Sequence, residues 1–219
     1  MQPTEYRRSA VAIPTGPLKI HGDLVLPNAA NAIVLFAHGS GSSRHSPRNR
    51  FVARILQEGG IATLLMDLLT KEEEAADAET GRWRFDVEML AERLIGATEW
   101  IRERLGADGP PKVGYFGAST GAAAALIAAT QVKSNIGALV ARGGRPDMAG
   151  GSLRDVEAPA LLIVGGADEV VLELNRKAFD RLRSPKELRI IPGATHLFEE
   201  PGALEEVVQL SRDWFLRYL

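Results

Sequence analysis

Gly117-Ala118-Ser119-Thr120-Gly121 places a serine between two glycines, after the mostly apolar run 112–116 and before the alanine-rich run 122–130. The two runs predict a buried strand followed by a helix, so Ser119 is expected at a sharp strand-to-helix turn. Such a turn exposes the hydroxyl of a nucleophile, and the flanking glycines leave room for the neighbouring strand and helix. The beginning of the helix also supplies unpaired N–H groups where negative charge would develop. The sequence therefore predicts that Ser119 is a nucleophile.

A serine hydroxyl needs a base that accepts its proton and a third group that orients the base. The apolar run 159–164 predicts a strand, which leads through two glycines to Asp168. The run 187–191 predicts another strand, which leads through a Pro-Gly turn to His196. The order Ser, Asp, His, each after its own strand, is the order found in α/β-hydrolases. Glu169 is the alternative acid, but Asp168 is preferred because it comes first after the glycine turn, where a short side chain can reach back to an imidazole.

Each of these residue types also has an ordinary structural role. A serine after a strand is commonly a helix N-cap, an aspartate at a strand end is commonly a cap or an Asx turn, and a lone histidine is commonly structural. The three placements agree in order and in strand context. This joint agreement favours a catalytic triad of Ser119, Asp168 and His196.

An oxyanion hole needs a second N–H donor besides that of the residue after the nucleophile, here Thr120. The apolar run 32–37 predicts a strand that ends in His38-Gly39-Ser40-Gly41-Ser42, where the glycines allow a sharp turn. We expect the Ser40 N–H to be the second donor, with the Gly41 N–H as the alternative. His38 is expected to position the loop rather than to act in catalysis, because His196 already supplies the base.

Strand and helix patterns alternate along the chain without an intervening linker. Residues 7–13 and 18–26 predict an antiparallel pair joined by a Pro-Thr-Gly-Pro turn. Further strands are expected at 32–37, 61–67, 112–116, 136–141, 159–164 and 187–191, and helices at 47–58, 86–105, 119–131, 171–182 and 202–218. This alternation predicts one α/β domain over residues 1–219, with a mainly parallel eight-stranded sheet and helices on both faces.

Several motifs resemble the dienelactone-hydrolase-like branch of the α/β-hydrolase superfamily. They are His38-Gly39-Ser40-Gly41-Ser42-Ser43-Arg44, the turn around Ser119, Arg142-Gly143-Gly144-Arg145-Pro146-Asp147, Gly166-Ala167-Asp168 and Gly193-Ala194-Thr195-His196. The resemblance runs from about Ser9 to the C-terminus. It implies the α/β-hydrolase fold and hydrolysis of carboxylic esters or lactones, with Ser119 as nucleophile, Asp168 as acid and His196 as base. Dienelactone hydrolase itself uses a cysteine nucleophile, and this chain has no cysteine. The chain is therefore more similar to the serine-bearing members of the branch, some of which are joined to a phosphoribosyltransferase domain.

These features predict a serine hydrolase that cleaves carboxylic esters or lactones through an acyl-enzyme. Two alternatives share the fold: an acyltransferase that uses the same triad, and a catalytically silent binding scaffold. No cofactor is expected. No metal is expected either, because cysteine is absent and the four histidines lack the spacing of metal ligands.

Charge and hydropathy exclude several kinds of partner. A formal net charge of -2 at pH 7 gives no reason to expect nucleic acid or an anionic membrane surface. No apolar run approaches the ~20 residues that span a bilayer, and residues 1–16 lack the apolar core of a signal peptide. We expect a cytoplasmic protein whose partner is a small ester or lactone.

Two charged segments, residues 42–54 and residues 71–84, are not explained by the fold. Residues 42–54 carry four arginines and a histidine with no acidic residue, and Arg142 and Arg145 follow a strand end on the side where open α/β sheets bind ligands. These side chains can form a positive rim that favours substrates with a carboxylate or phosphate. Structural ion pairs are the alternative.

The second charged segment is 71–84, which has five carboxylates and few apolar side chains. Its middle is expected to be a solvated loop rather than a lid, so the site has no large cap and suits small or medium acyl groups. Trp83 and Phe85 either close over the site or pack against the core. Packing is favoured because large aromatic side chains usually serve burial.

Overall fold

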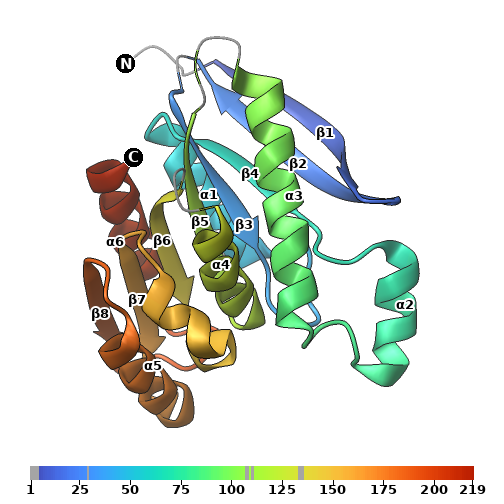
Figure 1. Cartoon of the computed structure of the whole chain (residues 1–219). Coiled ribbons are helices and arrows are strands. Elements are labelled where there is room, and N and C mark those ends of the chain that lie inside the picture. Colours follow the sequence, from blue (N-terminus) through green and yellow to red (C-terminus); the bar gives the residue numbers. More distant parts are fainter. Residues whose placement is uncertain (1–4, 29, 107–108, 110, 133–135) are drawn as a thin grey trace.

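An eight-stranded sheet forms the centre of the molecule, in the order β1-β2-β4-β3-β5-β6-β7-β8 (Figure 1). The computed structural model describes residues 5–28, 30–106, 109, 111–132 and 136–219. The strands are β1 (Tyr6–Thr15), β2 (Leu18–Pro27), β3 (Ala32–Ala37), β4 (Ala62–Met66), β5 (Lys112–Ala118), β6 (Ile136–Arg142), β7 (Ala160–Gly165) and β8 (Lys186–Ile191). β2 pairs antiparallel with β1 and β4, and every other neighbouring pair is parallel. The predicted mainly parallel sheet is confirmed.

Helices cover both faces of the sheet. They are α1 (Pro47–Glu58), α2 (Lys71–Thr80), α3 (Val87–Leu105), α4 (Thr120–Gln131), the 3₁₀ segment η3 (Pro146–Asp155), α5 (Glu169–Arg181) and α6 (Ala203–Tyr218). One core lies between the sheet and α3, α4, η3 and α5, and a second lies between the sheet and α1 and α6. α2 stands away from both layers (Figure 1). The described chain has no large cap, as predicted.

Alternation within the central strands separates the two cores. All six residues of β3 are buried. Ile33 and Leu35 contribute to the core under α3 and α4, whereas Val34 and Phe36 contribute to the core under α1 and α6. Because successive side chains of a strand point to opposite faces, a continuous apolar run is what a sheet covered on both sides requires.

The prediction of a solvated loop in the middle of residues 71–84 was wrong, because residues 71–80 form α2. Local signals rather than apolar packing explain this helix. Thr70 and Glu73 form a reciprocal capping box, with distances of 3.2 Å from Glu73 N to Thr70 Oγ1 and 2.8 Å from Thr70 N to Glu73 Oε2. Gly81, at a φ of 63°, ends the helix, and Asp77 is its one buried residue.

Two further details differ from the predictions. η3 was not predicted. Phe85 is 55% exposed, so the prediction that it packs against the core was wrong. Trp83 is half-buried. Within the described ranges, no helix combines the length and the apolar character that a bilayer span demands.

Candidate active site

The loops at the carboxyl ends of five neighbouring parallel strands converge at one edge of the sheet. β3 leads to the loop around Ser40, β5 to Ser119, β6 to Gly143, β7 to Asp168 and β8 to His196. Backbone hydrogen bonds hold these loops to their neighbours: Gly143 N–H donates to Ile163 O in β7 at 2.8 Å. Ligand sites of open α/β sheets lie at this edge.

Ser119 occupies a strained turn between β5 and α4. Its φ of 49° and ψ of -120° are rare for a residue with a side chain. The Ser119 N–H donates to Arg142 O at 3.3 Å, and Ser119 O accepts from Arg145 N–H at 3.0 Å, so the loop after β6 stabilises this conformation. Ser119 lies at the N-cap position of α4, yet its side chain makes no capping hydrogen bond. The ordinary structural role of a serine at this place is therefore not used.

The two glycines that flank Ser119 are required by close backbone approach. A Cβ on Gly117 would lie 2.5 Å from Ala122 Cα. A Cβ on Gly121 would overlap Ala37 O and lie 2.5 Å from His38 O. Strand β3 and helix α4 can approach the turn only because both positions lack a side chain, as the sequence indicated.

Asp168 and His196 form a hydrogen-bonded pair. His196 Nδ1–H donates to Asp168 Oδ2 at 2.7 Å, whereas Glu169 is exposed. Because a carboxylate only accepts, the Nδ1 atom carries the proton, and Nε2 is the acceptor of the neutral ring. Asp168 is the N-cap residue of α5 but makes no capping hydrogen bond with its side chain. A bond from Ala167 N to Ala194 O, at 2.9 Å, joins the two loops that carry the pair.

Ser119 and His196 border the same glycine loop, but no hydrogen bond joins their side chains among the described residues. Gly143 has a φ of 51°, and a Cβ there would lie 3.5 Å from His196 Cε1. The residue before it, Arg142, accepts the hydrogen bond from Ser119 N. Ser119 and His196 therefore both lie beside the loop that follows β6, without a hydrogen bond between their side chains. Catalytic hydrogen bonds are often long in structures without substrate.

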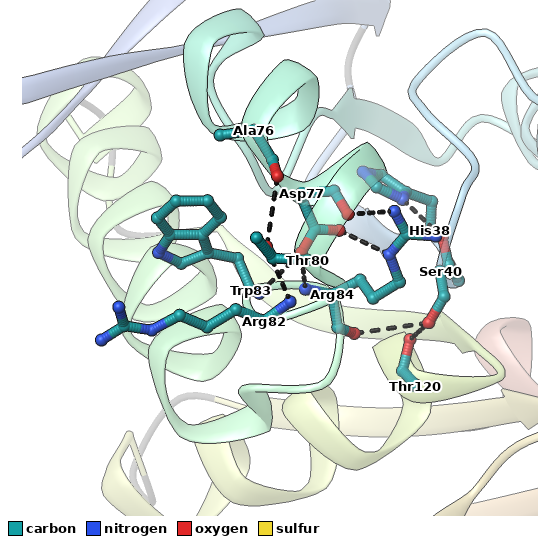
Figure 2. Close-up of polar contacts among 10 residues, drawn as sticks. His38, Ser40, Ala76, Asp77, Thr80, Arg82, Trp83, Arg84 and Thr120 are labelled. Atoms are coloured by element: carbon teal, nitrogen blue, oxygen red, sulfur yellow. Dashed lines mark hydrogen bonds and ion pairs between the residues drawn. The ribbon is translucent and has the colours of Figure 1, made fainter.

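Ser40 and Thr120, the predicted oxyanion-hole residues, contact each other through their side chains. Ser40 Oγ lies 3.0 Å from Thr120 Oγ1 and donates to Arg84 O at 3.3 Å (Figure 2). Within the described chain, the N–H groups of Ser40, Gly41 and Thr120 take part in no hydrogen bond.

His38 positions this loop, as the sequence indicated. Its Nδ1 donates to Gly39 O at 2.9 Å, and its Nε2 accepts from Leu68 N–H at 3.0 Å. Burial lowers the pKa of His38 below 6.5, which outweighs the opposite effects of Gly39 O and of nearby carboxylates. The ring is therefore neutral, and a neutral ring is what both hydrogen bonds require.

A small cavity of about 40 Å³ adjoins the Ser40 loop. Leu68, Leu69 and Leu90 form its apolar wall, and the Asp77–Arg84 ion pair forms part of its polar wall. No three His, Asp or Glu side chains in the described part of the chain, this cavity included, are grouped closely enough to bind a metal ion.

The arginines of the predicted positive rim differ in their pairing. Arg145 makes two hydrogen bonds of 2.8 Å to the Asp147 carboxylate. Arg142 is 7% exposed, and its Cζ lies 5.7 Å from the centroid of the Phe198 ring. It has no ion-pair partner among the described residues. Burial, with a smaller effect of the positive charge on Arg48, lowers the pKa of Arg142 to about 10.

The arginines of residues 42–54 all have a carboxylate partner. The pairs are Arg44 with Asp67 and Asp23, Arg48 with Glu199, Arg50 with Asp23 and Arg54 with Glu58. Their charges are largely compensated within the molecule.

Comparison with known proteins places the chain in a family. A model described as the dienelactone hydrolase family matches residues 20–214. Proteins from two strains of Mycobacterium tuberculosis, whose names propose a phosphoribosyl transferase, are 54% identical over 213 residues. The match covers 97% of this chain and 47% of each relative, so the chain spans about half the length of the curated relatives it matches.

Solved structures agree with the family model. A dienelactone hydrolase from Anabaena variabilis is 55% identical, with a TM-score of 0.93 and coverage of 98% of this chain and 99% of that one. An α/β serine hydrolase without a lid from Xanthomonas campestris shares the fold at 21% identity, with a TM-score of 0.75 and coverage of 96% and 94%. The chain belongs to the dienelactone hydrolase family of α/β-hydrolases.

Proposed function

We propose that this protein is a serine hydrolase that cleaves carboxylic esters or lactones through an acyl-enzyme. The observation that carries the proposal is the hydrogen bond between Asp168 and His196, at the same edge of the sheet as the strained turn of Ser119. Neither Ser119 nor Asp168 caps the helix that it precedes. Both polar side chains lie at helix N-cap positions without the stabilising bond that such positions normally provide, and a role in catalysis accounts for this.

In the proposed mechanism, Ser119 Oγ attacks the ester carbonyl while His196 Nε2 accepts its proton. Asp168 stabilises the imidazolium that forms, and the N–H groups of Ser40 and Thr120 donate to the oxyanion. The imidazolium then gives its proton to the departing alkoxide, which in a lactone stays attached to the acyl group. Water attacks the acyl-enzyme with His196 again as the base, and collapse of the second intermediate returns the proton to Ser119.

The cavity beside the Ser40 loop supports a preference for short acyl groups. Its volume of about 40 Å³ holds on the order of three water-sized groups. We therefore propose that acetyl to butyryl esters are cleaved faster than octanoyl esters. Replacing Leu90 with Ala removes part of the apolar wall, enlarges the cavity and should shift the preference to longer acyl chains.

The positive charge proposed to attract anionic substrates is assigned mainly to Arg142. Asp147 compensates Arg145, whereas the buried Arg142 guanidinium has no carboxylate partner among the described residues. An ester with a distal carboxylate should then have a higher kcat/KM than its neutral isostere. Added salt should reduce this advantage because it screens the attraction.

Phosphoribosyl transfer is not proposed for this chain. The mycobacterial names concern proteins about twice as long, and the part that matches this chain includes the residues of the candidate site. An acyltransferase would share every step except the attack of water. The partition of product between acid and a new ester, measured with and without added alcohol, separates the two activities.

The test combines turnover of 4-nitrophenyl esters with a fluorophosphonate probe. One adduct is expected, at Ser119, and Ser119→Ala should abolish both the labelling and the triad-dependent turnover. Asp168→Asn should reduce kcat by roughly 10⁴-fold and His196→Ala by roughly 10⁶-fold, as such changes do in serine proteases. Glu169→Gln is the matched control and should remain within about twofold of wild type. An adduct at another residue, or a larger loss for Glu169→Gln than for Asp168→Asn, contradicts the assignment.

A further inference from the structure

The one buried residue of α2 is a carboxylate, Asp77, and it organises the segment that follows the helix. Its Oδ1 accepts from Trp83 N–H at 2.7 Å and from Arg84 N–H at 3.2 Å, and its Oδ2 accepts from Arg84 Nε at 2.5 Å (Figure 2). Asp77 O accepts from Arg84 Nη2 at 2.6 Å and from Gly81 N–H at 2.8 Å. The Asp77–Arg84 pair therefore fixes the backbone of residues 81–84 against the end of α2.

The same backbone contacts the candidate oxyanion hole. Ser40 Oγ donates to Arg84 O at 3.3 Å and lies 3.0 Å from Thr120 Oγ1. Because the Ser40 hydroxyl has one proton and Arg84 O takes it, the Thr120 hydroxyl is the donor to Ser40 Oγ. An ordered chain of hydrogen bonds thus runs from Thr120 through Ser40 to Arg84 and Asp77 (Figure 2).

Other interactions restrain the loop on either side of Ser40 rather than Ser40 itself: Ser42 N–H donates to Gly39 O at 3.1 Å, and Arg44 N–H donates to Asp67 Oδ1 at 2.9 Å. His38 is fixed at the end of β3, but the backbone beyond it contains Gly39 and Gly41, the latter at a φ of 68°. Glycine has more backbone freedom than any other residue. Donors of an oxyanion hole contribute most when their positions are set before the charge develops.

We propose that Asp77 and Arg84 are positioning residues for the oxyanion hole and act through Ser40. This inference rests on the proposed hydrolase function. Burial alone would raise the pKa of Asp77, but hydrogen bonds from the Arg84 side chain and from the N–H groups of Trp83 and Arg84 lower it overall, so the carboxylate is charged at neutral pH. α2 then serves to deliver one carboxylate to the loop of the active site.

A second ion pair on the same helix provides a matched control. Arg93 pairs with Glu73 at 2.8 Å, and both side chains are largely buried. Arg93 also donates to Thr15 Oγ1 at 2.8 Å, but no described hydrogen bond leads from this pair to Ser40. Loss of either pair removes one ion pair that holds α2. Only loss of the Asp77–Arg84 pair interrupts the series of hydrogen bonds that leads to Ser40.

The test compares Asp77→Ala, Asp77→Asn, Ser40→Ala and the double variant Asp77→Ala/Ser40→Ala with Arg93→Gln. Turnover that depends on Ser119 is first measured for the wild type. We expect kcat of Asp77→Ala to fall by about 10- to 100-fold with KM within about threefold, because lost positioning costs at most what a lost oxyanion donor costs. Asp77→Asn retains an acceptor for both N–H groups and should recover part of kcat. Arg93→Gln should keep kcat within about twofold.

If Asp77 acts through Ser40, the double variant loses no more kcat than the more impaired single variant. Additive losses, an unchanged kcat in folded Asp77→Ala, or an equal loss in Arg93→Gln overturn the inference while the hydrolase function stands. If Asp77→Ala does not fold, Asp77→Asn with Ser40→Ala gives the same cycle. Absence of Ser119-dependent turnover in the wild type overturns the function and the inference together.

Discussion

Helices α4 and α2 are held in place by opposite means. All residues from Thr120 to Ala129 in α4 are buried, and most are alanines packed between the sheet, α3 and η3. In α2 only Asp77 is buried, and the helix depends on a capping box, the Asp77–Arg84 pair and the Arg93–Glu73 pair. Both helices border the candidate site, because α4 begins directly after Ser119 and residues that follow α2 contact Ser40.

The difference predicts where the molecule tolerates change. In α4, close packing determines which substitutions are tolerated, because a close-packed interior is destabilised even by the addition of a single methyl group. In α2, individual polar contacts decide, and the loss of one changes the local structure without removing apolar burial. Substitutions near α4 should therefore change global stability, and substitutions in α2 should change local order and activity.

The largest effect is expected for Gly121→Ala at the start of α4. The new Cβ would overlap Ala37 O, which belongs to a central strand and cannot move alone. We expect the free energy of unfolding to fall by at least about 4 kcal/mol, or the protein not to fold. Gly106→Ala, which has open space around it, should be neutral in urea denaturation. A folded Gly121→Ala variant of normal stability contradicts the close packing of α4.

A gain of stability is expected when the charge near this packed region is removed. Arg142→Met replaces a buried guanidinium that has no carboxylate partner among the described residues, and should raise the free energy of unfolding by about 1–4 kcal/mol, the range found when buried ion pairs are replaced by apolar side chains of similar volume. The same variant should lose the preference for an ester with a distal carboxylate. Arg145→Gln is the control and should change stability by less than about 1 kcal/mol, because its ion pair is partly exposed. A lower free energy of unfolding for Arg142→Met than for the wild type would show that the buried guanidinium does not destabilise the protein.

The buried ring of His38 makes stability depend on pH. Its pKa is lower in the folded protein than the value of 6.5 expected for the unfolded chain. As pH falls below about 6.5, the unfolded state binds a proton that the folded state does not, so stability decreases by up to about 1.4 kcal/mol per pH unit. Urea denaturation of wild type and His38→Gln between pH 7.5 and 5.5 should show the stability of the wild type falling faster. Parallel curves would mean that His38 does not cause the pH dependence.

The smallest effect is expected for Thr70→Ala at the N-cap of α2. Loss of the capping box should destabilise the helix locally by about 1 kcal/mol. Hydrogen exchange should then be faster for the amides of α2, with little change in the global unfolding midpoint. Ser46→Ala is the matched change in α1, a helix with an apolar face on the second core, and there the loss should appear in global unfolding. If both variants changed the global unfolding midpoint equally, helices held by apolar packing and helices held by polar contacts would not differ in this respect.

Periodic apolar patterns were sufficient to predict the sheet and most of its helices. The strand ends near Ser119, Asp168 and His196 were predicted for the same reason, since each follows an apolar run that is now part of a parallel sheet. The contact of His196 with Asp168 rather than Glu169 agrees with the preference stated from the sequence. The catalytic roles of these residues remain predictions.

The missed features are those in which polar contacts decide the structure. α2 was missed because its apolar content is low, although Thr70 and Glu73 have the spacing of a capping box and were a usable signal. The contact of Arg84 with Ser40 joins residues far apart in sequence, and no local pattern indicates it. The burial of Arg142 could not be predicted from the sequence either, because arginine side chains are mostly exposed and nothing in the local pattern marks this one as buried. Phe85 was misjudged by the general tendency of aromatic side chains to be buried.

Because each loop of the site follows a different strand, the site is complete only when the whole sheet has assembled. Ser119 follows a central strand, whereas His196 follows the edge strand β8. Contacts between segments distant in sequence form late, because the chain must first lose the entropy of the intervening loop. On the proposed assignment, a refolding molecule regains its compact shape before it regains turnover, because turnover needs the loop of His196 beside the distant turn of Ser119. On that assignment, a partly folded chain has no activated nucleophile.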